Sequence, residues 1–295
     1  MVLYIILIFT ALCIGMAISV YAFGTGGKRK HIFQDIYYSV EDNDGIGVLY
    51  TKKGEYSAIL KVNNPVQKYS ANIDAYYEFT QALTAIMQTL GEGYAIHKQD
   101  IFVRKQFNDE IGINHEFLSE SYFKYFNGRN YTESTCYLTI TQESKGSRLF
   151  SYDNKKWKEF LVKVRKVHDQ LRDAGLRVRY LSKTEASDYV DRYFAMNFKD
   201  KIISMSNYKV DGETISMGGR TAKVYSLIDV DHTNLPSIIR PYTNIEVNNV
   251  SMPVDLLSVI DSIPHADTVI YNQIVYLPNQ KRELSMLDKK KNRHA

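Results

Sequence analysis

The sequence has few cysteines, with two in 295 residues, Cys13 and Cys136. The first lies inside an apolar N-terminal run and the second in a predicted strand, so a disulfide framework is excluded. We therefore expect the soluble part of the chain in a reducing compartment. A hydrophobic share of 44% and a charged share of 24% are typical of a globular chain rather than a disordered one.

The sequence also lacks a strong charge of either sign. The formal net charge is +4 at pH 7, which is too small to indicate nucleic-acid binding from the total alone. The local distribution of the basic residues therefore matters more than their sum.

No phosphate-binding P-loop is present. Such a loop needs a glycine-rich turn followed by Lys and Ser or Thr at fixed offsets, so that backbone amides and one ammonium surround the phosphates. The nearest fragments, at residues 24–28 and 218–223, lack that spacing. We therefore assign no ATP-binding residue and no other cofactor-binding residue to this chain.

Hydrolase patterns are missing as well. The seven histidines never stand in pairs one helical turn apart with a Glu between them, and no Ser lies in a Gly-x-Ser-x-Gly string. His97 and Asp100 are close in sequence, but a strand would point them to opposite faces. We assign no catalytic or metal-binding residue and expect that this chain alone is not an enzyme. The alternative is an enzyme with an unrecognised site around His97 and Asp100.

One long apolar run stands at the N-terminus. The segment from Val2 to Phe23 contains no Asp, Glu, Lys, Arg or His, and it is long enough to cross about 30 Å of hydrocarbon as a helix. Lys28, Arg29 and Lys30 follow it and favour retention on the cytoplasmic side. We predict a transmembrane helix at 1–23 and a basic juxtamembrane linker at 24–45, with the bulk of the chain in the cytoplasm of a single-pass protein.

A cleaved signal peptide is the competing interpretation of this run, since Val20 and Ala22 resemble a small-residue cleavage site. A signal peptide needs a positively charged start, which Met1 to Tyr4 lack. The basic residues lie on the other side of the run, which favours the anchor.

Beyond residue 45, hydrophobic periodicity predicts a mixture of strands and helices, an α+β fold with antiparallel sheet. Strands are expected at 46–50, 55–62, 94–103, 135–141, 176–181, 222–230 and 268–277. Helices are expected at 73–90, 114–126, 157–174, 185–198 and 281–290. The Gly- and Ser-rich stretch 204–223 is expected to be an irregular, mobile excursion. We expect one mixed domain at 46–284, with a sub-boundary near 142–152 as the alternative, and a basic tail at 285–295.

Basic residues gather on the predicted helix that ends at Gly175. They are Lys155, Lys156, Lys158, Lys163, Arg165 and Lys166. Such a face suits anionic lipid head groups or an acidic partner subunit through salt-sensitive attraction, and a purely solvated helix face is the plainer interpretation. Direct contact with DNA is not expected, because the aromatic residues of this helix fall on its apolar side.

Several strings, taken in order, carry a family resemblance. They are YAIHKQDIFVRKQF at 94–107, FLSESYFKYFNGRNY at 117–131, TCYLTIT at 135–141, KVYSLID at 223–229 and IYNQIVYLP at 270–278. Together they resemble the N-terminal region of the TraG-family conjugation ATPases of Bacteroidetes conjugative transposons, relatives of the ATPases of VirB-type type IV secretion systems. The similarity runs from about residue 46 to residue 284.

The resemblance implies an N-terminal assembly and docking domain at the bacterial inner membrane. In that family a similar domain precedes an ATP-hydrolysing motor, and the whole serves DNA transfer. The partners it implies are other conjugation or secretion subunits, membrane lipid, and further copies of the chain assembled through the motor. ATP is implied only for that motor, because the residues of this chain contain no Walker motif. The N-terminal helix departs from many family members, and a fused membrane subunit would account for it.

Overall fold

The computed structural model describes residues 36–41, 45–51, 54–63, 73–108, 117–144, 153–204, 206–226, 241–242, 252–253, 263 and 265–294. The predicted transmembrane helix at 1–23, the cations Lys28, Arg29 and Lys30, and most of the juxtamembrane linker lie outside these residues. No helix within the described ranges is both long and apolar enough to span a membrane. The chain divides into two units, Met1–Tyr37 and Tyr38–Ala295, and the second contains nearly all described residues.

The second unit is a mixed α+β structure, as predicted, built on one large sheet. The strand order is β1-β2-β3-β5-β4-β12, with β6 beside β3, and the paired strands from β2 onward run antiparallel. The strands are β1 (Ile36–Glu41), β2 (Gly47–Thr51), β3 (Tyr56–Val62), β4 (Tyr94–Gln106), β5 (Asn130–Gln142), β6 (Val178–Tyr180) and β12 (Thr268–Leu277). The strands predicted at 46–50 and 55–62 are confirmed as β2 and β3, which pair as an antiparallel hairpin.

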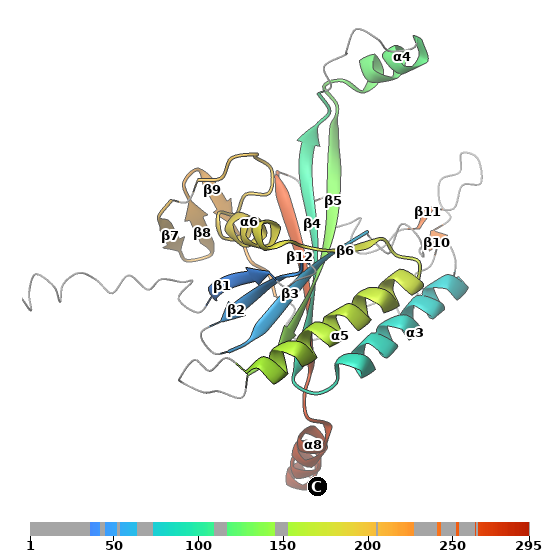
Figure 1. Cartoon of the computed structure of the whole chain (residues 1–295). Helices are drawn as coiled ribbons and strands as arrows, with labels where there is room; N and C mark the ends of the chain where they lie inside the picture. Colours follow the sequence, from blue (N-terminus) through green and yellow to red (C-terminus); the bar gives the residue numbers. More distant parts are fainter. Residues whose placement is uncertain are drawn as a thin grey trace, which may run out of the picture. The chain divides into compact units, whose positions relative to one another are not determined.

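Five helices occur in the described ranges: α3 (Ile73–Leu90), α4 (Phe117–Phe126), α5 (Asn154–Asp173), α6 (Lys183–Phe194) and α8 (Gln280–His294). Figure 1 shows α3 and α5 side by side along one face of the sheet. Their apolar residues and alternate residues of β2 to β5 form the larger core cluster, which contains residues from before and after 142–152. A smaller cluster on the opposite face packs α6 against the sheet.

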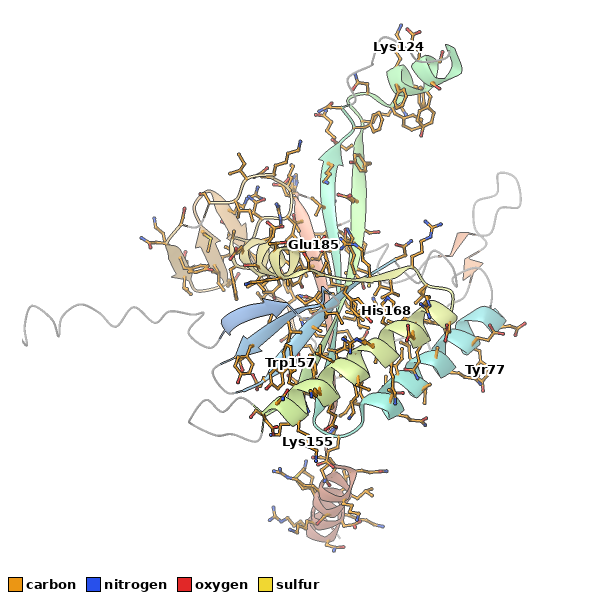
Figure 2. The ribbon with its side chains drawn as sticks, viewed as in Figure 1. Tyr77, Lys124, Lys155, Trp157, His168 and Glu185 are labelled. Atoms are coloured by element: carbon orange, nitrogen blue, oxygen red, sulfur yellow. The ribbon has the colours of Figure 1, made fainter. Side chains whose placement is uncertain are left out.

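The helix α5 has sequence signals at both ends and an apolar side that packs on the sheet. Asp153 caps its first turn by accepting hydrogen bonds from two backbone amides, and Gly175, with φ of 80°, follows its end. Five apolar residues along one side of the helix are buried, namely Phe160, Leu161, Val164, Val167 and Leu171. The single Trp of the chain, Trp157, packs edge-on against Tyr56 of β3 at 5.4 Å between ring centroids (Figure 2).

The strands β4 and β5 extend beyond their neighbours in the sheet. They pair with each other over thirteen residues each, as far as Gln106 opposite Asn130. The strand β3 pairs with β5 only from Cys136 onward, and β12 pairs with β4 only up to Val103. The outer end of the ribbon is therefore two strands wide among the described residues, and α4 lies at that end (Figure 1).

The prediction of an irregular segment at 204–223 is wrong for most of these residues. The strands β7 (Tyr208–Asp211), β8 (Thr214–Met217) and β9 (Arg220–Ala222) form an antiparallel three-stranded sheet. Each turn has two residues, Gly212-Glu213 and Gly218-Gly219, and glycine permits such tight hairpins. The expected strand 222–230 is absent over residues 223–226, and residues 227–230 lie outside the described ranges.

The boundaries of α6 also differ from the predicted 185–198. The helix begins two residues earlier because Ser182 and Glu185 form a capping box. It ends at Phe194, and Met196 follows with φ of 50°. The helix cannot continue through that left-handed residue.

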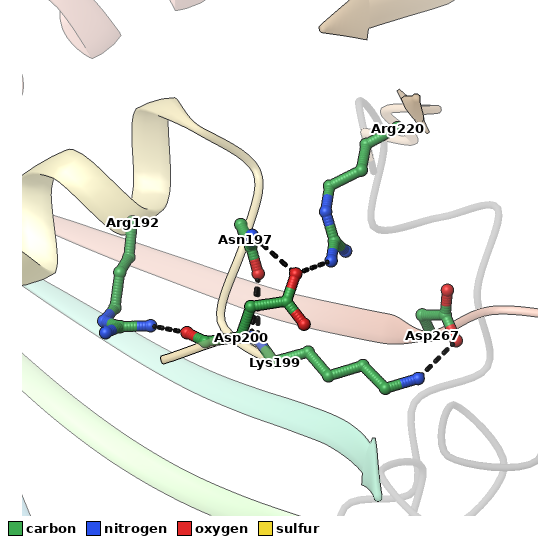
Figure 3. A network of polar contacts seen from close by, with 6 residues as sticks. All are labelled: Arg192, Asn197, Lys199, Asp200, Arg220 and Asp267. Carbon is green, nitrogen blue, oxygen red and sulfur yellow. Dashed lines mark hydrogen bonds and ion pairs between the residues drawn. The ribbon is translucent and has the colours of Figure 1, made fainter. Parts of the chain in front are cut away.

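A polar network fixes the segment after α6 (Figure 3). Arg192 donates to the carbonyl oxygen of Asp200 at 2.7 Å, and Asn197 donates to the Asp200 carboxylate at 3.0 Å. Arg220 of β9 donates to the same carboxylate at 2.7 Å, and Lys199 pairs with Asp267 before β12 at 3.2 Å. The three-stranded sheet is thereby joined to α6 and to the start of β12.

Two short strands complete the described structure. They are β10 (Pro241–Tyr242) and β11 (Met252–Pro253), which pair antiparallel with each other.

Candidate functional site

The structure does not bring the side chains of His97 and Asp100 together. The two side chains lie on opposite faces of β4, as the period of a strand requires. The His97 ring nitrogen Nε2 lies 3.1 Å from Oδ1 of Asn272 on β12, and burial lowers the pKa of this histidine. Asp100 is buried on the other face beside Lys98.

The buried thiol of Cys136 lies beside the buried carboxylate of Asp100. Cys136 is a free cysteine directly opposite Asp100 across β4 and β5. Burial, and secondly the neighbouring Asp100 carboxylate, raise the pKa of the Cys136 thiol to about 12. A thiol that stays protonated is a poor nucleophile and a poor metal ligand, so Cys136 acts as a small core residue. Within the described ranges, no three His, Cys, Asp or Glu side chains meet as a metal site.

Most of the predicted basic face of α5 is at the surface. Lys155, Lys156, Lys158 and Lys166 are exposed, and Arg165 is half-buried. Figure 2 shows Lys155 at the first turn of the helix. Acidic residues lie on the same exposed surface. Asp169, for example, pairs with Arg172 at 3.3 Å. The face therefore has mixed charge towards its C-terminal end.

Lys163 differs from the other lysines of this helix. Its Nζ donates to the carbonyl oxygen of Leu90 at 2.7 Å and lies 4.3 Å from the centroid of the Tyr94 ring. Glu159, one turn earlier, lies 3.6 Å from the same ammonium. Lys163 thus donates a hydrogen bond to a carbonyl group at the C-terminal end of α3 and does not extend into solvent towards a partner.

The end of the β4–β5 ribbon has many exposed aromatic side chains. We call residues 104–107 and 117–132 the aromatic arm. Tyr122 and Tyr125 are 57% and 59% exposed, and Tyr131 is also exposed. Lys124 also lies on α4 (Figure 2).

The aromatic arm is internally packed. The rings of Phe107 and Phe123 stack at 6.0 Å between centroids, which holds α4 against the end of the ribbon. The guanidinium of Arg129 lies 3.6 Å from the centroid of the Tyr125 ring, a cation–π contact. The tyrosines are therefore presented by a structured element. The sequence contained the signal for this surface, a dense run of aromatic residues, but we interpreted it only as a family marker.

A groove of about 460 Å³ lies between α6 and the ribbon. We call it the α6 groove. Its apolar and aromatic lining consists of Ile101, Val103, Tyr137, Leu181, Tyr189 and Phe198. This volume is within the range of ligand sites in proteins. No sequence pattern indicated the groove, because its residues come from separate elements that only the folded chain brings together.

Charged side chains surround the α6 groove in pairs. Arg179 on β6 lies 2.9 Å from the Glu185 carboxylate, and Arg192 donates to Asp188 at 2.7 Å. The hydrogen bond from Arg179, followed by that from the Ser182 backbone amide, lowers the pKa of Glu185. Arg179 is therefore held in an ion pair at the α6 groove.

Comparison of the sequence with models of known protein families and with curated proteins finds no match to either.

Proposed function

We propose that this chain is a membrane-tethered assembly and docking domain of a conjugative-transfer ATPase, which binds membrane subunits and positions an ATPase motor for DNA transfer. The aromatic arm is the observation that supports this proposal most. It presents exposed tyrosines on a packed helix at the end of a two-stranded ribbon. Tyr and Arg are enriched among the residues that dominate binding energy at protein interfaces.

The strings that carry the family resemblance support the same proposal through their position. Residues 94–107, 135–141 and 270–278 fall on β4, β5 and β12, three neighbouring strands of the large sheet. Residues 117–131 form α4 and the turn that returns to β5. The ribbon with its helix therefore combines three of the five strings, those at 94–107, 117–131 and 135–141, with the exposed aromatic side chains.

Replacing Tyr122 and Tyr125 together with Ser tests the docking role. In mating assays with the full-length protein, we expect a lower transfer frequency and reduced co-purification of membrane subunits, because two exposed anchors are lost. The matched control is Tyr77→Ser on α3, since Tyr77 is 65% exposed and lies outside the aromatic arm. Wild-type transfer and co-purification for the arm variant would overturn the docking role.

The family assignment has its own test in the gene. Sequencing beyond codon 295 should show an open frame that continues into a G-x-x-x-x-G-K-[ST] string, since that string binds the phosphates of ATP in the motor. A frame that continues without any such string would refute the attachment to a motor.

The tether is tested by extraction. A helix at residues 1–23 should keep the protein in the membrane pellet after an alkaline wash, because a spanning helix is held by the hydrocarbon core. A variant lacking residues 1–23 is the control and should be released. Release of the intact protein would contradict the membrane tether.

A second candidate function is a motorless membrane adaptor that binds anionic lipid or DNA through α5. The exposed Lys155, Lys156 and Lys158 favour it, since charged lipid surfaces attract clustered lysines. Reversal of these three charges should abolish sedimentation with vesicles that contain phosphatidylserine. Sedimentation that is indifferent to both charge reversal and salt would exclude this function.

A further inference from the structure

From the outer edge of β12 we infer a dimer, in which β12 of one copy pairs antiparallel with β12 of a second copy and joins the two large sheets. This inference does not depend on the family resemblance or on the aromatic arm. It rests on three features of the strand: an edge that is open among the described residues, a sequence without charge or proline, and a self-complementary register.

The open edge is the first feature. Among the described residues β12 is the last strand of the large sheet, and β4 pairs with it along one edge over all ten residues. In that register the Arg104 amide donates to the carbonyl oxygen of Asp267 at 2.9 Å. Backbone groups of an antiparallel strand alternate between its two edges, so the even-numbered residues of β12 direct their N–H and C=O groups outward. They are Thr268, Ile270, Asn272, Ile274 and Tyr276.

The side chains are the second feature, because they do not protect this edge. Edge strands are commonly kept from pairing by charged residues, proline or short length. The strand β7, at an edge of the three-stranded sheet, carries Lys209 and Asp211 within four residues. None of the ten residues of β12 is charged, a proline or buried, and Ile274 and Tyr276 are 49% and 61% exposed. The edge therefore suits another uncharged strand.

The register is the third feature, and it selects a second copy of β12 as that strand. A two-fold axis through Asn272 places Thr268 opposite Tyr276 of the second copy, so all five outward residues of each copy exchange backbone hydrogen bonds. An axis through either neighbouring residue leaves at least one of them unpaired. Asn272 then lies opposite Asn272 of the second copy, and Ile270 lies opposite Ile274. Like side chains thus meet, and no charge is brought into the contact.

The charge of α8 favours the antiparallel arrangement. This helix begins three residues after β12 ends, and it has six Lys or Arg and two Asp or Glu, a net charge equal to the +4 of the whole chain. In the antiparallel dimer the two Leu277 residues lie about ten residues, or roughly 34 Å, apart along the strands. That distance exceeds the Debye length of about 8 Å at physiological salt, so the two helices do not repel each other. Parallel strands would place them side by side.

The test is sedimentation velocity of the full chain in detergent over a range of protein concentrations. The ten residues of β12 are fewer than the roughly 20–30 residues a side of a stable interface, so we expect a reversible dimer. Asn272→Lys places two ammonium groups at the axis and should weaken dimerisation at least about tenfold. Tyr77→Lys is the matched control, since Tyr77 is 65% exposed on α3. A monomer at every concentration, or a dimer that Asn272→Lys leaves unchanged, would overturn the inference.

Disulfide cross-linking tests the register, in a Cys13→Ser background in which Cys136 is buried. Asn272→Cys places two thiols opposite each other, with about 5.5 Å between Cα atoms, which a disulfide can span. Gln273→Cys is the control, because the same axis sets its two copies about two residues apart along the strands, beyond the limit of about 7 Å. We expect a covalent dimer on air oxidation of the first variant only. Equal cross-linking of both variants, or of neither while thermal melting shows both folded, would contradict this dimer.

Discussion

The ammonium of Lys163 on α5 lies 2.7 Å from the carbonyl oxygen of Leu90, the last residue of α3. The contact joins the two helices that cover the same face of the sheet, next to Gln170, which donates to Thr89 at 2.9 Å. A cation at the C-terminal end of a helix satisfies a carbonyl and opposes the negative end of the helix dipole.

Lys163→Met should therefore destabilise the protein. We expect the free energy of unfolding to fall by about 1–2 kcal/mol, since a partly buried hydrogen bond from a charged donor is lost. Lys155→Met, at an exposed position of the same helix, should change it by no more than about 0.5 kcal/mol. Urea denaturation followed by Trp157 fluorescence measures both variants. Equal stability of the two would mean that the Lys163 contact contributes nothing.

Gly47 marks a close approach of two backbones. A Cβ at this position would lie 2.6 Å from the carbonyl carbon and oxygen of Ser182, and the Gly47 amide donates to Leu181 at 2.8 Å. Gly47→Ala should destabilise the protein by about 1–3 kcal/mol, because backbone atoms have to shift. Thermal unfolding measures the loss.

The control for this position is Gly219→Ala on the turn between β8 and β9. A Cβ there has no neighbour within 4 Å, so stability should stay within about 0.5 kcal/mol of wild type. If both variants melt at the wild-type temperature, β2 and the start of α6 are not in the close contact described.

Much of the secondary structure could be predicted from the spacing of apolar residues along the sequence. The predicted helix at 73–90 matches α3, the apolar stripe of α5 is buried, and the strand at 268–277 matches β12. These elements cover a core, so their apolar residues repeat at the period of a helix or a strand. Strand order was beyond this reasoning, since β12 pairs with β4 across more than 160 residues of sequence.

The elements that the sequence analysis missed contribute few side chains to the hydrophobic core. The ends of β4 and β5, around Lys105 and Tyr131, pair with each other without a third described strand, and they show no apolar alternation. The three-stranded sheet was missed because we weighed its glycines as loop residues rather than as two-residue hairpin turns. The α6 groove is formed by tertiary contacts alone. The candidate sites were thus less predictable than the fold.

Cys136 should be unreactive in the folded protein. With a pKa of about 12 only roughly one thiol in ten thousand is ionised at pH 8, and the side chain is buried. In a Cys13→Ser background, we expect very slow labelling by iodoacetamide under native conditions and rapid labelling in guanidinium chloride. Rapid native labelling would contradict the buried position opposite Asp100.

Glu185 should give the stability of the protein a dependence on acidic pH. Its hydrogen bonds from Arg179 and from the Ser182 backbone amide lower its pKa in the folded state. A carboxylate with a lowered folded pKa stabilises the protein above its unfolded pKa, and this stabilisation is lost as the pH falls through the folded value.

Glu185→Gln should therefore reduce the free energy of unfolding at pH 7, by about 1 kcal/mol or less because the side chain is largely exposed and the pair is screened by solvent. The difference from wild type should shrink as the pH falls below about 4.3, the usual pKa of glutamate. Urea titrations at a series of pH values measure it, with Glu283→Gln on α8 as the control. If the difference in unfolding free energy between wild type and Glu185→Gln stays constant as the pH falls, the negative charge of Glu185 is not its cause. The ion pair with Arg179 would then have no part in stabilising the start of α6.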